Sequence, residues 1–217
     1  MRVGRSYGGH AGELYFQYQA AAAELGAKLD RWKFEQHVDE RDTVVDFGCG
    51  SGAMLAALGA ARRIGVEVSE SAAAVARRRG IEVVRFTSEL EDGVADVVIC
   101  NHALEHTVAP FDELCELHRI LKHGSTFVLW LPIDDWRVQR TDLDDPDHHL
   151  YAWTPRLLRN LLAEADFDVV DCRVVAHAWP PMTHLLARLP NRMFDAAAFA
   201  SSILRKRRQL MALARRR

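Results

Sequence analysis

Val44-Val45-Asp46-Phe47-Gly48-Cys49-Gly50-Ser51-Gly52 is an apolar run that ends in an aspartate and three alternating glycines. A short apolar run bounded by glycines predicts a buried strand of a parallel sheet, and the glycines predict a tight turn into a helix. In an open parallel sheet, ligands bind beyond the carboxyl ends of the strands. We therefore expect this turn to line a binding site.

Asp46 indicates which kind of ligand the turn binds. A carboxylate beside the turn would repel a pyrophosphate but attract an ammonium, while the N–H groups at the start of the next helix favour an anion. A ligand that carries both charges is an α-amino acid. Glu67 ends a second apolar run, Ile64-Gly65-Val66, and can accept both hydroxyls of a ribose. An amino acid joined to a ribonucleoside is S-adenosylmethionine.

Two other interpretations of this turn are weaker. Enzymes that bind nicotinamide dinucleotides also use a glycine turn, but the spacing here is G-x-G-x-G, and Asp46 precedes the first glycine by two residues. An NAD-dependent oxidoreductase is therefore the alternative class. The turn could also close a strand–helix connection without binding anything, with Glu67 as a solvated strand end.

Apolar runs alternate with segments of helical period from residue 43 onward, which predicts an α/β fold. We expect a doubly wound, Rossmann-like, seven-stranded, mostly parallel sheet with helices on both faces. Strands are expected at 43–47, 64–68, 82–86, 95–100 and 125–131, with a sixth from Phe167. A seventh, Gln209–Leu213, is expected to pair antiparallel at the sheet edge.

Local signals predict the helices between these strands. Ser69 is a candidate N-cap for a helix over 72–79 that Gly80 ends. Pro110 and Pro155 suit first helical positions. The helix that begins at Pro110 is expected to place Phe111, Leu114, Leu117 and Leu121 on its apolar face and to end before Gly124. The helix that begins at Pro155 is expected to place Leu157, Leu158, Leu161 and Leu162 on one face.

A single domain over residues 1–217 accommodates these elements. We expect a helical N-terminal cap at 1–40, a cofactor-binding core at 41–176, a helical insertion or lid at 177–204, and a basic edge strand and tail at 205–217. Net charge is −2, which gives no indication of a nucleic-acid partner. Four scattered cysteines and the lack of a signal peptide or membrane-length apolar run predict a cytoplasmic protein.

Over about residues 30–176 the chain resembles class I S-adenosylmethionine-dependent methyltransferases, in particular the bacterial small-molecule and cell-envelope group. The matching stretches are VVDFGCGSG (44–52), GVEVS (65–69), ADVVICNHALEH (95–106), ELHRILKHGSTFVLWLP (116–132) and HLYAWTPRLLRNLLAEADFDVV (149–170). The chain departs from the family in the short stretch between strands three and four, and in Lys122-His123-Gly124, where the family usually has Lys-Pro-Gly.

The resemblance implies specific cofactor contacts. Asp46, Gly48, Gly50 and Glu67 would contact the cofactor, with Cys49 and Val68 beside them. The turn after the third strand (Thr87, Ser88 and Glu89) and the end of the fourth (Asn101 and His102) would flank the adenine and the methyl donor.

His102-Ala103-Leu104-Glu105-His106 also matches H-x-x-E-H, a zinc-protease signature that needs a helix. Its position after the fourth strand of a parallel sheet argues against that interpretation. Some related quinone-precursor methyltransferases hold a divalent cation here with two acids and a histidine, but this chain has His102 in place of the first acid. We therefore predict no resident metal.

Methyl transfer from a sulfonium is an in-line displacement, so most of the catalysis is alignment and exclusion of water. A base is needed only for a protonated acceptor such as a hydroxyl, and histidine is suited to neutral pH. His102, His106 and His149 are the candidates, and we predict that His102 or His149 takes the proton. The alternative for each is a structural histidine that bonds loop backbone.

Three segments could contact an acceptor. The loop 133–153 combines aspartates with aromatic residues and could bind a saccharide or a cation, or simply be solvated. N-terminal aromatic residues are expected to cap the cofactor. The C-terminal segment joins an apolar face to basic residues, which would suit a lipid-linked substrate at an anionic membrane, with a lid packed on the sheet edge as the alternative. The loop residues are Asp134, Asp135, Trp136, Asp142, Asp144, Asp145, Asp147, Tyr151 and Trp153. The N-terminal aromatic residues are Tyr7, Tyr15, Phe16 and Tyr18. The C-terminal segment contributes the apolar Met182, Leu185, Leu186, Leu189 and Phe194 and the basic run 205–208.

The sequence thus predicts a methyltransferase that uses S-adenosylmethionine to methylate a small molecule, at oxygen in preference to nitrogen or carbon. Besides the oxidoreductase, an inactive cofactor-binding module that serves a partner enzyme is the other alternative.

Overall fold

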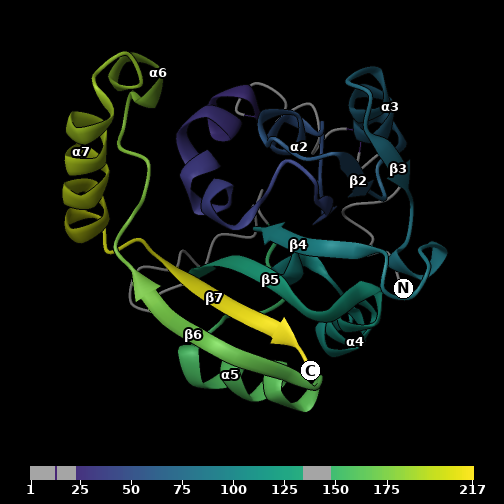
Figure 1. Ribbon diagram of the computed structural model, residues 1–217. Helices are drawn as coiled ribbons and strands as arrows, with labels where there is room; N and C mark the ends of the chain where they lie inside the picture. The colour runs from purple at the N-terminus through teal and green to yellow at the C-terminus, as the bar shows by residue number, and fades with distance from the viewer. Residues whose placement is uncertain (1–12, 14–22, 134–147) are drawn as a thin grey trace.

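A seven-stranded sheet forms the centre of the protein in a computed structural model that describes residues 13, 23–133 and 148–217 (Figure 1). The strand order is β3-β2-β1-β4-β5-β7-β6, and the first five strands in the chain run parallel. The strands are β1 (Thr43–Phe47), β2 (Arg62–Val66), β3 (Glu82–Val84), β4 (Ala95–Asn101), β5 (Leu121–Ile133), β6 (Phe167–Val175) and β7 (Arg208–Arg216). The predicted doubly wound α/β fold is confirmed.

The last strand, β7, is antiparallel as expected, but its predicted place at the sheet edge is wrong. β7 pairs with β5 on one side and with β6 on the other, so β6 is the edge. Leu210, Ala212 and Ala214 are almost completely buried. A strand with such an apolar middle is more stable between two neighbours, and the arginines at its ends lie outside this buried part.

Helical segments connect the strands. They are residues 23–30, the 3-10 turns η1 (Arg31–Lys33), η2 (Glu35–His37), η3 (Thr87–Glu89) and η4 (Leu104–His106), and the helices α2 (Ala53–Ala57), α3 (Glu70–Arg78), α4 (Pro110–Ile120), α5 (Pro155–Glu164), α6 (Thr183–Leu186) and α7 (Asn191–Leu204). Ser69 caps α3 by accepting from the Ala72 N–H, and Gly80 follows that helix with φ of +76°. Thr154 caps α5 in the same way.

Some predicted boundaries shift. The strand β2 ends at Val66, so Glu67 and Val68 follow the strand and do not belong to it. The helix α4 ends at Ile120, and Leu121 already begins β5. Ile120, not Phe111, belongs to the buried face of α4, because the Phe111 side chain is partly exposed.

Helices cover both faces of the sheet with separate apolar clusters. One cluster contains Leu114 and Leu117 of α4 and Leu158 of α5. The other contains Phe34, which lies between η1 and η2, and Leu55 of α2. Figure 1 shows α2 and α3 on one side of the sheet and α4 and α5 on the other.

An insertion that contains α6 and α7 joins β6 to β7. Val175 at the end of β6 pairs with Gln209, and Ile133 at the end of β5 pairs with Arg208. The insertion therefore leaves the sheet at the carboxyl ends of the parallel strands, where ligands bind in folds of this kind. Pro190 separates the two helices, as predicted.

Two groups of predicted acceptor contacts lie outside the described residues. They are the acidic-loop residues Asp134, Asp135, Trp136, Asp142, Asp144, Asp145 and Asp147, and the N-terminal Tyr7, Tyr15, Phe16 and Tyr18.

Candidate functional site

In the glycine turn after β1, the backbone of Gly48 and Gly52 lies close to neighbouring side chains, whereas Gly50 faces open space. Gly48 and Gly52 have φ of +78° and +73°, and a Cβ there would lie 2.4 Å from Ala103 Cβ and 2.3 Å from Ile81 Cδ1. Only glycine fits such positions. At Gly50, also with positive φ, a Cβ would meet no atom within 4 Å. The backbone of Gly50 therefore faces space that a ligand could enter.

Two carboxylates flank this open position. Asp46, in β1, is 4% exposed. Glu67 directly follows β2, and its two oxygens accept the N–H groups of Gly50 and Ser69, each at 2.8 Å. Because a carboxylate oxygen has two lone pairs, each oxygen of Glu67 keeps one for a further donor such as a ribose hydroxyl.

The pKa values of both carboxyls are raised. Burial, and next the charge of Glu67, raise the pKa of Asp46 to about 7. Burial also raises the pKa of Glu67, although the backbone N–H groups that it accepts oppose this effect. A cation placed beside Asp46 would stabilise its ionised form. The ammonium of an α-amino acid supplies that cation, so these residues fit S-adenosylmethionine.

The contact expected between the carboxylate of the amino-acid ligand and the start of the next helix differs from the prediction. The helix after the turn, α2, has only five residues, so its dipole is small. The N–H groups of Gly48 and Cys49 both donate to the Val66 carbonyl, at 2.9 and 3.2 Å, and hold the turn against β2. The carboxylate of a ligand thus depends less on the helix start than the sequence suggested.

Cys49 has a structural side chain. A Cβ added at Gly65 would lie 2.3 Å from Cys49 Sγ, so the thiol occupies the space above that glycine. The Cys49 side chain also belongs to the apolar cluster under α2. A contact between this residue and the cofactor would therefore involve its backbone.

The turn after β3 is stabilised by its own acid. The carboxylate of Glu89 accepts the N–H groups of Arg85 and Phe86, at 3.1 and 2.7 Å. Ser88 is exposed in the same turn. The adenine contacts expected of Ser88 and Glu89 stay predictions, as do the contacts expected of Val68, which lies beside Glu67.

A buried polar network lies at the end of β4. Lys33 Nζ donates to Asp30 Oδ2 at 3.1 Å, to Gln209 Oε1 at 2.8 Å, and to Asn101 Oδ1 at 3.4 Å. The Lys33 side chain is completely buried and lies 4.9 Å from the centre of the Trp130 ring. Two predicted cofactor residues, Asn101 and His102, end β4 or directly follow it. Both contact this network.

The network determines which nitrogen of His102 carries the proton. Gln209 Nε2 donates to the His177 carbonyl at 2.9 Å, and Gln209 Oε1 accepts from Lys33, so the amide orientation is fixed. His102 Nε2 lies 3.2 Å from the same Oε1 and must therefore donate. The lone pair of His102 is then on Nδ1, which lies 3.6 Å from Glu105 Oε1.

The three predicted histidines gather around Glu105. His106 Nε2 is 3.9 Å from Glu105 Oε1, and the rings of His106 and His149 are 5.1 Å apart. His149 is held there because the Leu150 N–H donates to the Glu105 carbonyl at 2.9 Å. The structure thus brings together residues from the end of β4 and from the segment before α5.

His102 and His106, which follow β4, are both neutral at physiological pH. Burial, and next the charge of Lys33, lower the pKa of His102 to about 4. Burial, and next His149, lower the pKa of His106 to about 4, while a hydrogen bond with the His148 backbone opposes this effect. A neutral imidazole has a lone pair that can accept a proton.

The same side chains include a group that could hold a metal. Ligand atoms of Glu105, His106 and His149 all lie within 4.8 Å of one another. The segment is not an α-helix, since His102 has φ of +54° and 104–106 is a 3-10 turn. The helical geometry that the zinc-protease signature needs is therefore not formed.

One aromatic residue expected to line an acceptor site has a different role. Trp153 is 2% exposed and belongs to the apolar cluster under α5. Tyr151 packs against this cluster and donates its hydroxyl to the Val108 carbonyl at 2.8 Å. Packing beneath the loop is thus the correct interpretation for Trp153.

Sequence reasoning missed Asp30, Lys33, Trp130, His177 and Gln209. Gln209 offers the clearest signal, since it is an uncharged polar residue between the basic run 205–208 and the apolar stretch 210–214. Asp30 and Lys33 stand at the i, i+3 spacing of an ion pair. Nothing in the sequence indicates that this pair meets β4 and β7.

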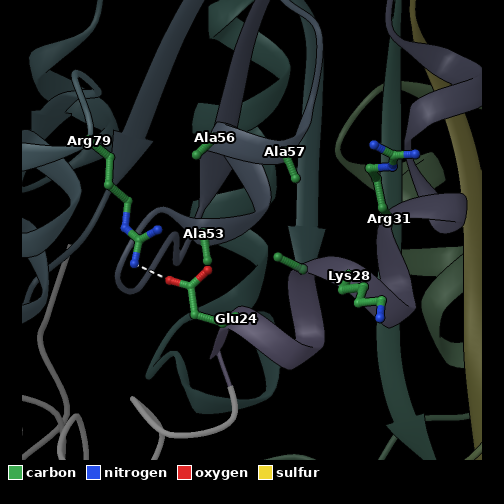
Figure 2. A pocket seen from close by; sticks show the side chains of 8 residues that line it. Glu24, Lys28, Arg31, Ala53, Ala56, Ala57 and Arg79 are labelled. Carbon is green, nitrogen blue, oxygen red and sulfur yellow. Dashed lines mark hydrogen bonds and ion pairs between the residues drawn. The ribbon is translucent and has the colours of Figure 1, made fainter. Parts of the chain in front are cut away.

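A separate pocket of about 530 Å³ lies between the helical segment 23–30 and α2. Figure 2 shows the ion pair between Glu24 and Arg79 at one side and Lys28 at the other. Asp46 and Glu67 do not line this pocket, so it is distinct from the site predicted for the cofactor.

The fold is that of an α/β protein, and the two carboxylates at the ends of β1 and β2 are placed where they could hold a nucleoside cofactor. Residues 12–171 match the family model of a methyltransferase domain. An uncharacterized 37.1 kDa protein of a Streptomyces fradiae transposon is 30% identical over 135 residues, which are 55% of this chain. The chain matches 39% of that protein, well under half of its length.

Solved structures share the fold at low identity. An S-adenosylmethionine-dependent methyltransferase from Archaeoglobus fulgidus has a TM-score of 0.65 and 18% identity, with 93% of this chain and 99% of that chain covered. The geranyl diphosphate C-methyltransferase of Streptomyces coelicolor, solved with S-adenosyl-L-homocysteine, has a TM-score of 0.61 and 18% identity, with 93% and 80% covered. The family match over residues 12–171 shows that the chain belongs to the class I S-adenosylmethionine-dependent methyltransferases, and S-adenosylmethionine is the cofactor of that family.

Proposed function

We propose that this protein transfers the methyl group of S-adenosylmethionine to an oxygen atom of a small molecule. The observation that carries the proposal is the pair of carboxylates beside the open Gly50 position, Asp46 in β1 and Glu67 after β2. Asp46 would bind the ammonium and Glu67 the ribose hydroxyls. The cofactor supplies an activated methyl group on a sulfonium.

The acceptor would bind beside the histidines at the end of β4. A hydroxyl acceptor must lose its proton as the methyl group is transferred, and a neutral imidazole can take it. Nδ1 of His102 carries a lone pair and faces Glu105, and His149 lies across the same group. We propose that His102 or His149 is the base and that His106 positions His149.

The choice of oxygen over nitrogen or carbon depends on these histidines. An amine acceptor is already nucleophilic when neutral, so it would not need a base next to the methyl donor. A saccharide or a lipid-linked molecule is the acceptor class we favour, because both offer hydroxyl groups.

The proposal is tested by calorimetry and by turnover. S-adenosylhomocysteine should bind, NADH should not, and Asp46→Asn together with Glu67→Gln should abolish binding of S-adenosylhomocysteine. Unchanged affinity in that double variant would contradict the assignment. Turnover is then measured with hydroxyl acceptors and tritiated methyl donor.

An inactive module that binds the cofactor for a partner enzyme is the second candidate. The low pKa of His102 favours it to some extent, because a base with a pKa of about 4 is weak. Tight binding of S-adenosylhomocysteine without turnover on any hydroxyl acceptor would favour this role.

A further inference from the structure

The helix α7 is apolar on two opposite faces. Its inner face is buried, with Phe194 at 3% exposure and Ala198 at 0%. Met193 and Phe199 are each 56% exposed, and Leu204 is 82% exposed. Helices that are apolar all round are normally covered on all sides. The outer face of α7 is therefore suited to contact something other than water.

The apolar surface continues onto α6 and the turn that follows it. The exposed large hydrophobic side chains of this insertion are Met182, Leu185, Leu189, Met193, Phe199, Ile203 and Leu204. They are half of all such side chains among the described residues, gathered in one short segment. Figure 1 shows α6 and α7 standing together at one end of the sheet. We call these seven side chains the outer apolar face.

Basic side chains surround this face. Arg188 and Arg192 are exposed in the same insertion, and the exposed run 205–208 contains four more basic residues. Asp195 is the single acid between 177 and 208. An amphipathic surface with basic and apolar side chains and almost no acid is typical of helices that lie in the interface of an anionic membrane.

We propose that the outer apolar face and the basic run 205–208 dock this protein on an anionic lipid surface. A second copy of the chain is a poorer occupant, because a two-fold contact would bring both basic sets together. Lipid headgroups neutralise the same charges, and the apolar side chains then enter the boundary with the acyl chains.

Docking would place the candidate active site next to the membrane. Trp179 Nε1 donates to Asp30 Oδ1 at 3.3 Å, and the His177 carbonyl accepts from Gln209, so the start of the insertion contacts the polar network. The insertion also leaves the sheet at the end where the cofactor residues lie. This consequence rests on the proposed function and indicates an acceptor that is supplied from the lipid.

Co-sedimentation of the full chain with vesicles tests the proposal. We expect binding to phosphatidylglycerol–phosphatidylcholine vesicles at low salt, little binding to phosphatidylcholine alone, and loss of binding as salt rises. Arg205→Gln, Lys206→Gln and Arg207→Gln together should weaken binding about 100-fold, at roughly 1 kcal/mol per charge. Phe199→Ser with Ile203→Ser should weaken it as well. Leu157→Ser with Val170→Ser, which changes exposed apolar residues elsewhere, is the matched control and should leave it unchanged.

Two results would overturn the proposal: no sedimentation with anionic vesicles at low salt, or equal binding by the Phe199 and Leu157 double variants. A dimer in analytical ultracentrifugation that Phe199→Ser dissociates, without vesicle binding, would assign the face to a second copy. Affinity for S-adenosylhomocysteine is measured for each variant. Vesicle binding without cofactor binding would leave the docking surface standing and reject the proposed function.

Discussion

Lys33 Nζ donates a hydrogen bond of 2.8 Å to Oε1 of Gln209, which lies 176 residues further along the chain. This contact joins the N-terminal helical segment to β7 directly beside His102. It fixes the Gln209 amide, which in turn assigns the proton of His102 to Nε2. A residue far from the cofactor motif thus sets the protonation of a candidate base.

We expect Lys33→Met to destabilise the protein by about 3–5 kcal/mol. The substitution leaves Asp30 buried without its ammonium partner, and breaking a buried ion pair from one side costs this much. Urea unfolding monitored by circular dichroism measures the change. Asp30→Asn combined with Lys33→Met is the matched control and should recover a large part of the loss, since no lone charge is then buried. A double variant as unstable as Lys33→Met alone would show that packing of the lysine stem, not charge, is responsible.

Affinity for S-adenosylhomocysteine should fall below pH 7. Asp46 has a pKa raised to about 7 in the free protein, so acid protonates it and removes the charge that attracts the ammonium. Above pH 7 the carboxylate is ionised and binding is strongest. Below pH 7 we expect a loss of about tenfold per pH unit until the pKa of the bound state is reached. Calorimetric titrations between pH 5.5 and 8 measure this dependence.

Asp46→Asn supplies the control for that titration. The amide does not ionise, so the variant should bind weakly with an affinity that hardly changes between pH 5.5 and 7. A steep dependence that persists in the variant would assign the titration to another group, with Glu67 as the first candidate.

Turnover at saturating cofactor should have a different pH dependence from binding. His102 has a pKa lowered to about 4, so it stays neutral and able to accept a proton down to about pH 5. We expect kcat to be nearly constant from pH 8 to 5, while kcat/KM for the cofactor falls below pH 7. His102→Ala with His149→Ala should lower kcat by about 10²–10⁴-fold when the cofactor is saturating for the variant. Intact turnover in this double variant would reject both histidines as the base.

Gly65→Ala should destabilise the protein by about 1–3 kcal/mol, because the added Cβ would lie 2.3 Å from Cys49 Sγ in a packed cluster. Thermal unfolding measures the change. Adding Cys49→Ala removes the sulfur and should recover most of the loss. If the second substitution recovers nothing, the strain lies in the β2 backbone and not in the thiol contact.

The sequence predicted what depends on local pattern. The run Val44–Gly52 has the period and the glycines of a buried strand and a tight turn, and the structure forms both. Ser69 was recognisable as a cap because a side-chain oxygen before a helical segment accepts its first N–H groups, and Pro110 and Pro155 were recognisable as first helical residues. These signals act over a few residues, so one sequence is enough to identify them.

The errors arise where distant segments meet. Arg208–Arg216 has a strand pattern, but its pattern does not say whether it has one neighbour or two. Lys33 carries a charge, which favours an exposed position on average. Its burial depends on Asp30 and Gln209 together, and only the tertiary fold brings these partners to one place.

Val175 and Gln209 are partners on adjacent antiparallel strands, so the whole stretch between them is in topological terms an enlarged hairpin loop. Loops with neighbouring ends can change length at modest entropic cost. Asp46 lies in β1 and Glu67 directly follows β2, and this loop joins neither strand. On the proposed function, we expect that exchanging this loop between relatives changes the acceptor while cofactor binding stays the same.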